Sequence, residues 1–294
     1  MKTKQIKSAI GLFFFGLSAF QLQGQALLWE ISGNGLSEKS YLFGSIHIQD
    51  KRVFQFDSAV WNRFEKSSNL ALEFDIGSVN SLEVAERMMM SQSYRELLSE
   101  EDYQLLLSVA EDHLDIPFFL IDRMKPFFVL VMFTLSYISE ADPDGYEEEP
   151  MDMYFLRKAR EAQKNILELE SFDEQMNIID RMFDEQLKAL IKFIRNPNLQ
   201  TDLITEYENL ITAYLSQDDT KLYELILESS DSDTFMKYFL NERNHNMLKK
   251  IRTFVANGST FIVVGAGHLA GEEGLVNLLK NDGYTLTPIK FNEE

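Results

Sequence analysis

Apolar residues recur with two different periods along the chain, and the change of period divides it into distinct parts. Short apolar runs at 26–31, 40–48 and 69–76 have the length and composition of strands. The turn residues Ser-Gly-Asn-Gly at 32–35 separate the first two runs, which predicts a hairpin. From about 80 to 255, apolar residues instead recur at i, i+3 and i+4, which predicts a largely helical region. The helices expected there cover 97–113, 117–124, 126–139, 151–163, 172–194, 199–215, 219–228 and 231–257.

Strand-like patterns return inside this helical region and again near the C-terminus. The interior segment 165–170 has a β-like pattern between two expected helices. The segments 258–264 and 284–291 flank a short expected helix at 274–281, and this order predicts a right-handed βαβ unit. Because sheet strands come from both ends of the chain, the ends must meet. The pattern predicts an α/β (α+β) fold, with a central mixed sheet built from both chain ends and a large helical insertion at about 80–255.

The first 24 residues, 1–24, have the layout of a secretory signal peptide. Three lysines near the start precede an apolar run at 9–20 that is too short to span a bilayer comfortably, and a polar stretch with small residues follows. We predict export to the periplasm or the cell exterior; retention as an N-terminal membrane anchor is the alternative. Residues 25–294 are expected to form a single domain with no membrane span after leader removal.

Composition limits the classes of function. The 294 residues are 45% hydrophobic and 12% aromatic, which is ample for a substantial core. A formal net charge of −19 would repel phosphates, so nucleic acid is not an expected partner. The chain has no cysteine, which excludes disulfides and rules out cysteine as a nucleophile or metal ligand.

Two of the four histidines occupy the same local context. His47 follows an apolar run and Gly44, and His268 follows an apolar run with Gly265 and Gly267. Glycine permits close approach of the backbone, and ligands of α/β proteins bind at the carboxyl ends of the strands. If the two strands are neighbours, both imidazoles can reach one site. The other two histidines lie among polar residues of helical segments, where a structural role is favoured.

Carboxylates and one arginine extend this candidate site. Glu73 lies within an apolar run, where an ionised carboxylate is costly unless it is paired or bound to a metal. The alternative is an alternating strand whose Glu73 faces water. Asp75 shares the face of Glu73, and Glu170 ends the interior strand in the same way. Arg243 lies in the helix that precedes the last strand–helix–strand segment.

Two imidazoles and a carboxylate are a common ligand set for a divalent ion. His47, Glu73 and His268 offer nitrogen and oxygen without thiolate, which suits zinc, manganese or cobalt. Such an ion would polarise a carbonyl and generate hydroxide at neutral pH, while Arg243 would hold an oxyanion or a substrate carboxylate. Because only neutral histidine binds metal, activity is expected to fall below about pH 6.

A set of short motifs follows in a fixed order: Gly-Ser-Ile-His at 44–47, Leu-Glu-Phe-Asp at 72–75, Leu-Glu-Ser at 169–171, Glu-Gln at 174–175, Glu-Arg-Asn at 242–244, Val-Gly-Ala-Gly-His-Leu at 264–269 and Gly-Tyr at 283–284. This set resembles the TraB/GumN family, which includes the TIKI metalloproteases and is related to the erythromycin-esterase-like superfamily. The resemblance covers nearly the whole chain after the leader. It implies a metal-dependent hydrolase with its catalytic site on His47, Glu73 and His268, supported by Glu170 and Arg243.

The leading hypothesis is therefore an exported metal-dependent hydrolase, a metalloprotease-like enzyme that acts on a peptide or a small-molecule substrate. The alternative is a binding protein that uses the same crevice to sequester a peptide or a haem-like ligand without turnover. A helical scaffold with no site is a third possibility. An open coordination position and a general base beside the ion distinguish the first hypothesis from the second.

Overall fold

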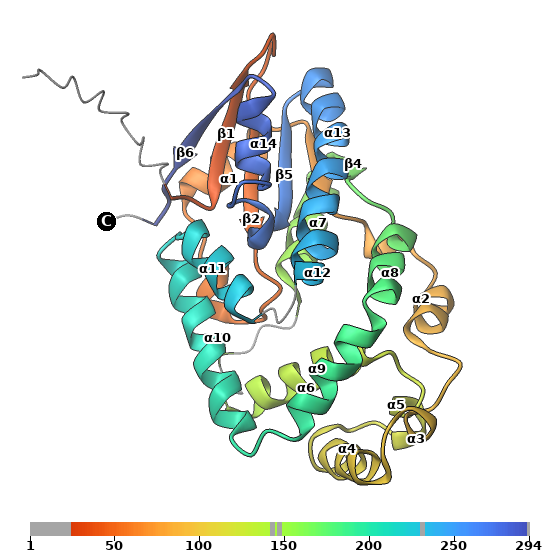
Figure 1. The fold of residues 1–294 in the computed structure, drawn as a ribbon. Coiled ribbons are helices and arrows are strands. Elements are labelled where there is room, and N and C mark those ends of the chain that lie inside the picture. Colours follow the sequence, from red (N-terminus) through yellow and green to blue (C-terminus); the bar gives the residue numbers. More distant parts are fainter. Residues whose placement is uncertain (1–24, 142–144, 146–148, 230–232, 293–294) are drawn as a thin grey trace, which may run out of the picture.

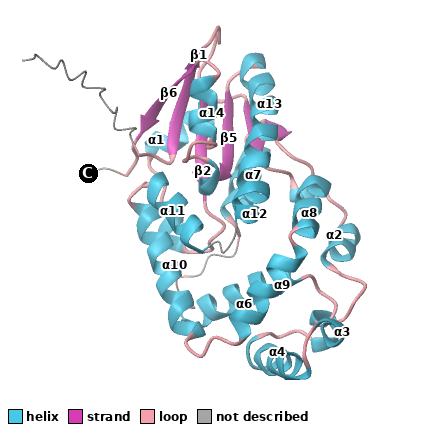
Figure 2. Ribbon diagram, in the orientation of Figure 1, coloured by secondary structure: helices cyan, strands magenta, loops and turns pink. Residues whose placement is uncertain are grey.

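A mixed β-sheet forms one end of the molecule, and helices form the other (Figures 1 and 2). The computed structural model describes residues 25–141, 145, 149–229 and 233–292, so the predicted signal peptide at 1–24 lies outside the described residues. The strands are β1 Leu28–Gly33, β2 Ser40–Ser45, β3 Asn69–Leu72, β4 Asn165–Glu168, β5 Thr260–Gly265 and β6 Tyr284–Ile289. The helices are α1 Ser58–Lys66, α2 Ser81–Met88, α3 Tyr94–Leu97, α4 Glu100–His113, α5 Phe118–Ile121, α6 Pro126–Ala141, α7 Met151–Glu161, α8 Phe172–Arg181, α9 Phe183–Ile194, α10 Leu199–Leu215, α11 Asp219–Ser229, α12 Asp233–Phe235, α13 Glu242–Asn257 and α14 Leu275–Asn281.

The sheet has the order β4-β3-β5-β2-β1-β6 and draws strands from both ends of the chain. β1 and β2 form the predicted hairpin, and β2 is the parallel neighbour of β5, with Gly44 opposite Val264. β5 also pairs in parallel with β3, and β3 with β4. These findings confirm the predicted α/β fold with a mixed sheet and a helical insertion. The four adjacent strands β4, β3, β5 and β2 therefore run in one direction and end at the same edge.

The C-terminal strand–helix–strand segment has the predicted order but a wide crossover. β6 pairs antiparallel with β1 instead of with β5. Since β1 is antiparallel to β2, and β2 is parallel to β5, the strands β5 and β6 are parallel with β2 and β1 between them. The helix α14 connects them across the face of the sheet (Figure 1).

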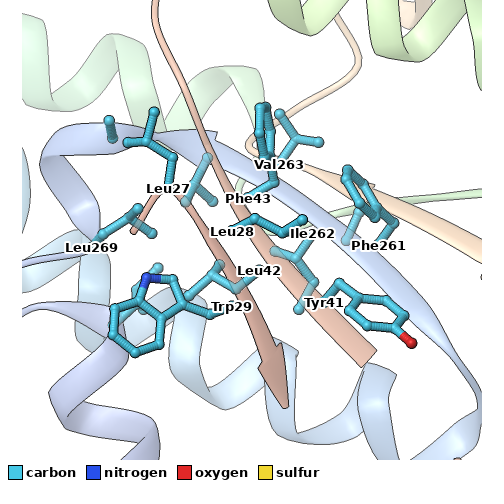
Figure 3. Close-up of a cluster of buried hydrophobic side chains, with 14 of the residues drawn as sticks. Leu27, Leu28, Trp29, Tyr41, Leu42, Phe43, Phe261, Ile262, Val263 and Leu269 are labelled. Atoms are coloured by element: carbon cyan, nitrogen blue, oxygen red, sulfur yellow. The ribbon is translucent and has the colours of Figure 1, made fainter. Parts of the chain in front are cut away.

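The main core lies on both faces of this sheet. Phe43 and Phe261 from β2 and β5 pack against Phe155 of α7, with ring centroids 5.3 and 5.7 Å away, and Phe64 of α1 joins them. Side chains alternate along a strand, so Leu42 and its partner on the adjacent strand, Ile262, point to the opposite face of the sheet. The helices α13 and α14 lie on that face (Figure 1). Figure 3 shows the buried side chains that β1, β2 and β5 contribute.

The helical insertion has a second core of its own. Leu106 of α4, Phe133 of α6 and Leu190 of α9 are fully buried in it. In the part of the chain that the structure describes, no helix is long and apolar enough to cross a membrane.

Two predicted helices are interrupted. The expected helix at 172–194 divides at Met182, where the buried side chain of Gln186 donates a hydrogen bond of 3.0 Å to the carbonyl of Ile179. The expected helix at 231–257 instead contains a π-helix, Met236–Asn241, just before α13. Neither break follows a glycine or proline, so the sequence pattern gave no signal for them.

Candidate functional site

The site lies where the four parallel strands end. His47 follows β2, Glu73 follows β3, Glu170 follows β4 and His268 follows β5. Because these strands run in the same direction, their carboxyl ends meet at one edge of the sheet. Residues far apart in the sequence thus approach one another through strand pairing alone.

Gly265 marks the point on which three of these side chains converge. A Cβ atom placed on it would lie 3.5 Å from Glu73 Oε1, 3.7 Å from His268 Cδ2 and 3.9 Å from His47 Nε2. The two imidazoles are therefore no farther apart than the sum of the last two distances. His268 Nε2 itself lies 3.8 Å from Glu73 Oε1. The structure brings both histidines and Glu73 together.

Asn244 determines which nitrogen of His268 faces this point. Its side-chain NH2 donates a hydrogen bond of 2.7 Å to the backbone carbonyl of Glu273, which can only accept. Its Oδ1, 2.6 Å from His268 Nδ1, must therefore accept the proton of that nitrogen. Nε2 is left with its lone pair toward Glu73. Burial, together with the charge of Arg243, lowers the pKa of His268 to about 3, so the ring is neutral.

His47 is held in the same orientation by a different partner. Its Nδ1 lies 3.1 Å from Asp152 Oδ2, and its Nε2 is the atom that faces Gly265. Asp152 raises the pKa of His47 above its ordinary value, although water screens the pair because 60% of the imidazole side chain is exposed. Of the two histidines, His47 is thus the one that gains a proton first as the pH falls.

Glu73 is fixed by donors on both of its oxygens. Oε1 accepts a hydrogen bond of 2.8 Å from the backbone N–H of Gly265. Oε2 accepts from Arg243 at 2.6 Å and from the side-chain amide of Gln175 at 3.0 Å. Burial alone would raise the pKa of Glu73, but the charge of Arg243 outweighs it and holds the pKa well below the ordinary range. The carboxylate is therefore ionised.

Arg243 is occupied by protein groups. Its Nε and one terminal nitrogen donate to Glu170 at 3.0 and 2.8 Å, the same terminal nitrogen reaches Glu73, and the other donates to the carbonyl of Phe239 at 3.1 Å. The side chain is buried. Its place at the start of α13, directly after the π-helix, aims it at the carboxylates. Its hydrogen bonds orient Glu73 and Glu170, which makes it a positioning residue in this structure.

Other candidates from the sequence lie apart from this point. Asp75 accepts hydrogen bonds from Arg160 at 2.7 Å and from the backbone N–H of Gly77 at 2.9 Å. Gly44 packs against the turn that carries His268, and a Cβ there would lie 2.6 Å from Leu269 Cδ1.

The remaining residues of interest have structural surroundings. A Cβ on Gly267 would lie 2.6 Å from Ile226 Cδ1, so this glycine allows close packing of the turn on α11. His113 and His245 contact Glu140 and Glu273 away from the site.

Sequence reasoning assigned no role to Asp152, Asn244 or Gln175. Asn244 directly follows Arg243, and Gln175 lies shortly after Glu170, both within the ordered motifs. Their closeness to these candidate site residues was the one sequence feature that could have indicated a role at the site. Asp152 lies in the first turn of α7 after an acidic stretch, and nothing local distinguishes it from the other acids there.

A pocket of about 380 Å³ opens beside the convergence point. His47, Glu73, Gln175 and Arg243 form its polar side. The rest of its wall is apolar and comes mainly from α2, α6 and α8, including Val84, Met88, Phe127, Phe128, Phe172 and Met176. The strand ends thus supply the polar groups, and the helical insertion supplies the apolar wall.

The sequence that builds this site matches a known protein family. The model of the TraB/PrgY/gumN family matches residues 27–288. The chain belongs to the TraB/PrgY/gumN family. This confirms the resemblance that the ordered motifs indicated.

Similar curated proteins share little sequence identity with this chain. Metalloprotease TIKI2 of Danio rerio is 22% identical over a match that covers 88% of this chain and 60% of the TIKI2 length. Metalloprotease TIKI1 of the same species is also 22% identical, over 88% of this chain and 62% of the TIKI1 length. The uncharacterized protein YbaP of Shigella flexneri is 21% identical over 82% of the chain and 88% of its own length. This TraB/PrgY/gumN protein therefore spans about 60% of the length of the TIKI relatives.

The names of the TIKI relatives imply a metal ion, and the donor chemistry of this site suits one. His47 presents its Nε2, and His268 its Nε2–Cδ2 edge, toward a space beside Glu73 that a methyl group on Gly265 would fill. Their Nδ1 atoms are held by Asp152 and Asn244, as is usual for metal-bound histidines. As placed here, however, the described residues contain no group of three or more His, Asp or Glu side chains arranged as metal ligands. Glu73 is turned toward Arg243 and the backbone of Gly265.

Proposed function

We propose that this protein is an exported metal-dependent hydrolase that cleaves peptides. The observation that carries the proposal is the convergence of His47 Nε2, His268 and Glu73 on Gly265, at the polar side of an apolar pocket. The names of the TIKI relatives support the class of activity. The leader-like sequence at 1–24 supports export to the periplasm or the cell exterior.

The side chains would divide the work as follows. His47 and His268 would hold the divalent ion (zinc, manganese or cobalt), with Glu73 as the oxygen ligand beside them. Such an ion, when bound, polarises a carbonyl and lowers the pKa of water. Asp152 and Asn244 hold the two rings, and Arg243 keeps Glu73 ionised and oriented.

The reaction needs no other reagent than water. Water adds its hydroxide to the carbonyl carbon, the C–N bond breaks, and the amine leaves with the remaining proton. Glu73 is a poor proton acceptor because its pKa is held low, which favours a role in ligation. Asp152 Oδ1 is buried without a hydrogen-bond partner among the described residues, and lies beside the exposed imidazole where a proton could be held in transit.

Substitution of the two histidines tests this proposal. Purified protein loaded with manganese, cobalt or zinc is incubated with a peptide library, and products are identified by mass spectrometry. We expect cleavage that chelation abolishes and added metal restores, and expect His47→Ala and His268→Ala each to abolish it. His113→Asn changes a histidine outside the pocket and should cleave normally. Elemental analysis should find bound metal in the wild type and less in both alanine variants.

The sequestering alternative predicts a different result. Peptides would then be recovered intact after long incubation, with an affinity that a chelator does not change. Such an outcome would refute hydrolysis at this site.

A further inference from the structure

Two hollows flank the polar groups of the site. The large pocket of about 380 Å³ has a smaller neighbour of about 240 Å³, and His47, Glu73, Phe74 and Gln175 line both. The two hollows therefore adjoin along one shared wall, which carries His47 and Glu73 of the proposed catalytic groups. A ligand that crosses this wall places its central atoms at His47 and Glu73 and a part of itself in each hollow.

The apolar parts of the two hollows offer no cationic partner to a free carboxylate. Arg243 is the one lysine or arginine among the described residues that line either hollow. It already donates to Glu73 at 2.6 Å and to Glu170 at 2.8 Å, so two carboxylates face one guanidinium. A further buried carboxylate would be unpaired, and an unpaired buried charge is strongly unfavourable. The terminal carboxylate of a peptide is therefore a poor occupant, as is an acidic side chain.

Both hollows are lined mainly by apolar residues, which suits the apolar side chains of a ligand. Beyond the polar side, the large pocket is lined by phenylalanine, methionine, valine and isoleucine. The small pocket adds Leu72, Pro150, Met153 and Leu156. Asp152, the partner of His47, also lines the small pocket.

We infer that the protein is an endopeptidase that selects an uncharged apolar side chain on each side of an internal peptide bond. Successive side chains of an extended peptide point in opposite directions, so a bond over the shared wall sends its two flanking side chains into different hollows. The large pocket takes a leucine, methionine or phenylalanine side chain. The inference rests on the proposed function, because it assigns the substrate class of the same site.

The test combines blocked peptides with a variant that fills the large pocket. Acetylated and amidated peptides vary the two residues around one internal bond among glycine, leucine, phenylalanine, lysine and aspartate, and a matched set keeps a free C-terminal carboxylate. Val84→Trp in α2 places an indole in the large pocket. Leu82→Trp is the matched control, because Leu82 lies on the same helix, is 65% exposed and does not line the pocket.

We expect kcat/KM to be at least about tenfold higher for leucine or phenylalanine than for aspartate or glycine. Val84→Trp should remove this preference, and Leu82→Trp should keep it. If Val84→Trp fails to fold by circular dichroism, Met88→Ala decides instead: the enlarged pocket should extend the preference to tryptophan. Preference for acidic residues, dependence on a free carboxylate, or equal behaviour of the pocket variants and the control would overturn the inference.

Calorimetric binding of the same blocked peptides separates this inference from the proposed function. Cleavage without apolar preference refutes the inference and leaves hydrolysis standing. Apolar-selective binding that Val84→Trp weakens, without any cleavage, refutes both the hydrolase and the endopeptidase and leaves only the two apolar subsites standing.

Discussion

Asn244 is a single side chain whose loss should act on metal binding more than on folding. It fixes the Nδ1–H tautomer of His268 by accepting its proton at 2.6 Å. In Asn244→Leu that bond is absent, so the ring can rotate or change tautomer. We expect metal affinity, measured by calorimetry, to fall about 10- to 100-fold, as is usual for such supporting residues. Nitrogen NMR of the histidine rings should show a changed protonation pattern at His268.

The matched control for this substitution lies on the same helix. Asn246 is exposed, and its side-chain oxygen accepts a hydrogen bond of 3.0 Å from Lys249. Asn246→Ala should leave metal affinity and the NMR signals of His268 unchanged. A uniform loss of affinity in both variants would mean that α13 as a whole, rather than Asn244, sets the position of His268.

Arg243 makes a contribution that belongs mainly to stability. It is buried between Glu73 and Glu170, and Arg243→Met leaves the buried carboxylate of Glu170 and the largely buried carboxylate of Glu73 without this partner. We expect the free energy of unfolding in urea to fall by about 3–5 kcal/mol. Adding Glu170→Gln should recover part of the loss. Arg181→Met, which breaks an exposed pair with Glu242, should cost at most about 1 kcal/mol.

At the scale of elements, the site depends on two strand ends that lie against each other, and their glycines have different tasks. A Cβ on Gly44 would lie 2.6 Å from Leu269 Cδ1 and 3.1 Å from the backbone of Ala266, so β2 and the turn after β5 would have to separate. A Cβ on Gly265 would meet nothing closer than 3.5 Å, and the backbone there has an ordinary φ of −53°. Gly44 allows β2 to pack closely against the turn after β5, whereas Gly265 leaves space between the side chains of His47, Glu73 and His268.

These two glycines predict opposite outcomes for the same substitution. Gly44→Ala should lower the free energy of unfolding by about 1–3 kcal/mol. Gly265→Ala should change it by less than about 1 kcal/mol but abolish metal binding and cleavage, because its methyl occupies the space between His47, Glu73 and His268. Urea unfolding and metal titration of both variants check this. Normal metal binding by Gly265→Ala would contradict the proposed position of the ion.

The elements that could be predicted from the sequence are those with strong local signals. The apolar runs before His47 and His268, each closed by a glycine, predicted two strands whose ends carry the site, and β2 and β5 are indeed neighbours. The break at Met182 and the π-helix Met236–Asn241 could not be predicted, because the sequence carries no local signal such as glycine or proline at either place. Asp152 was not identified as a site residue for the same reason, because only the folded chain shows that it faces His47.

In the whole molecule, the sheet and the helical insertion divide the site between them. One large hydrophobic core forms around the sheet, and a second core forms among α4, α6 and α9. Between them, Phe172, Met176 and Ile179 of α8 form a small third cluster, with Phe74 and Phe127 packed against it. Since these residues line the large pocket, a ligand there contacts the insertion and the strand ends together. Variation of the insertion can thus change specificity while the strand ends keep the chemistry.

The charge of the whole molecule predicts how substrates reach this pocket. A formal net charge of −19 attracts cations over a distance that salt shortens. For apolar peptides flanked by lysines, we expect the association rate constant in stopped-flow fluorescence to fall roughly tenfold between about 20 and 500 mM NaCl. Glutamate flanks should give the reverse trend, and neutral flanks almost none. Because the apolar subsites bind uncharged side chains, the dissociation rates should stay nearly constant in all three series; a salt dependence confined to dissociation would place the charged contacts inside the site instead.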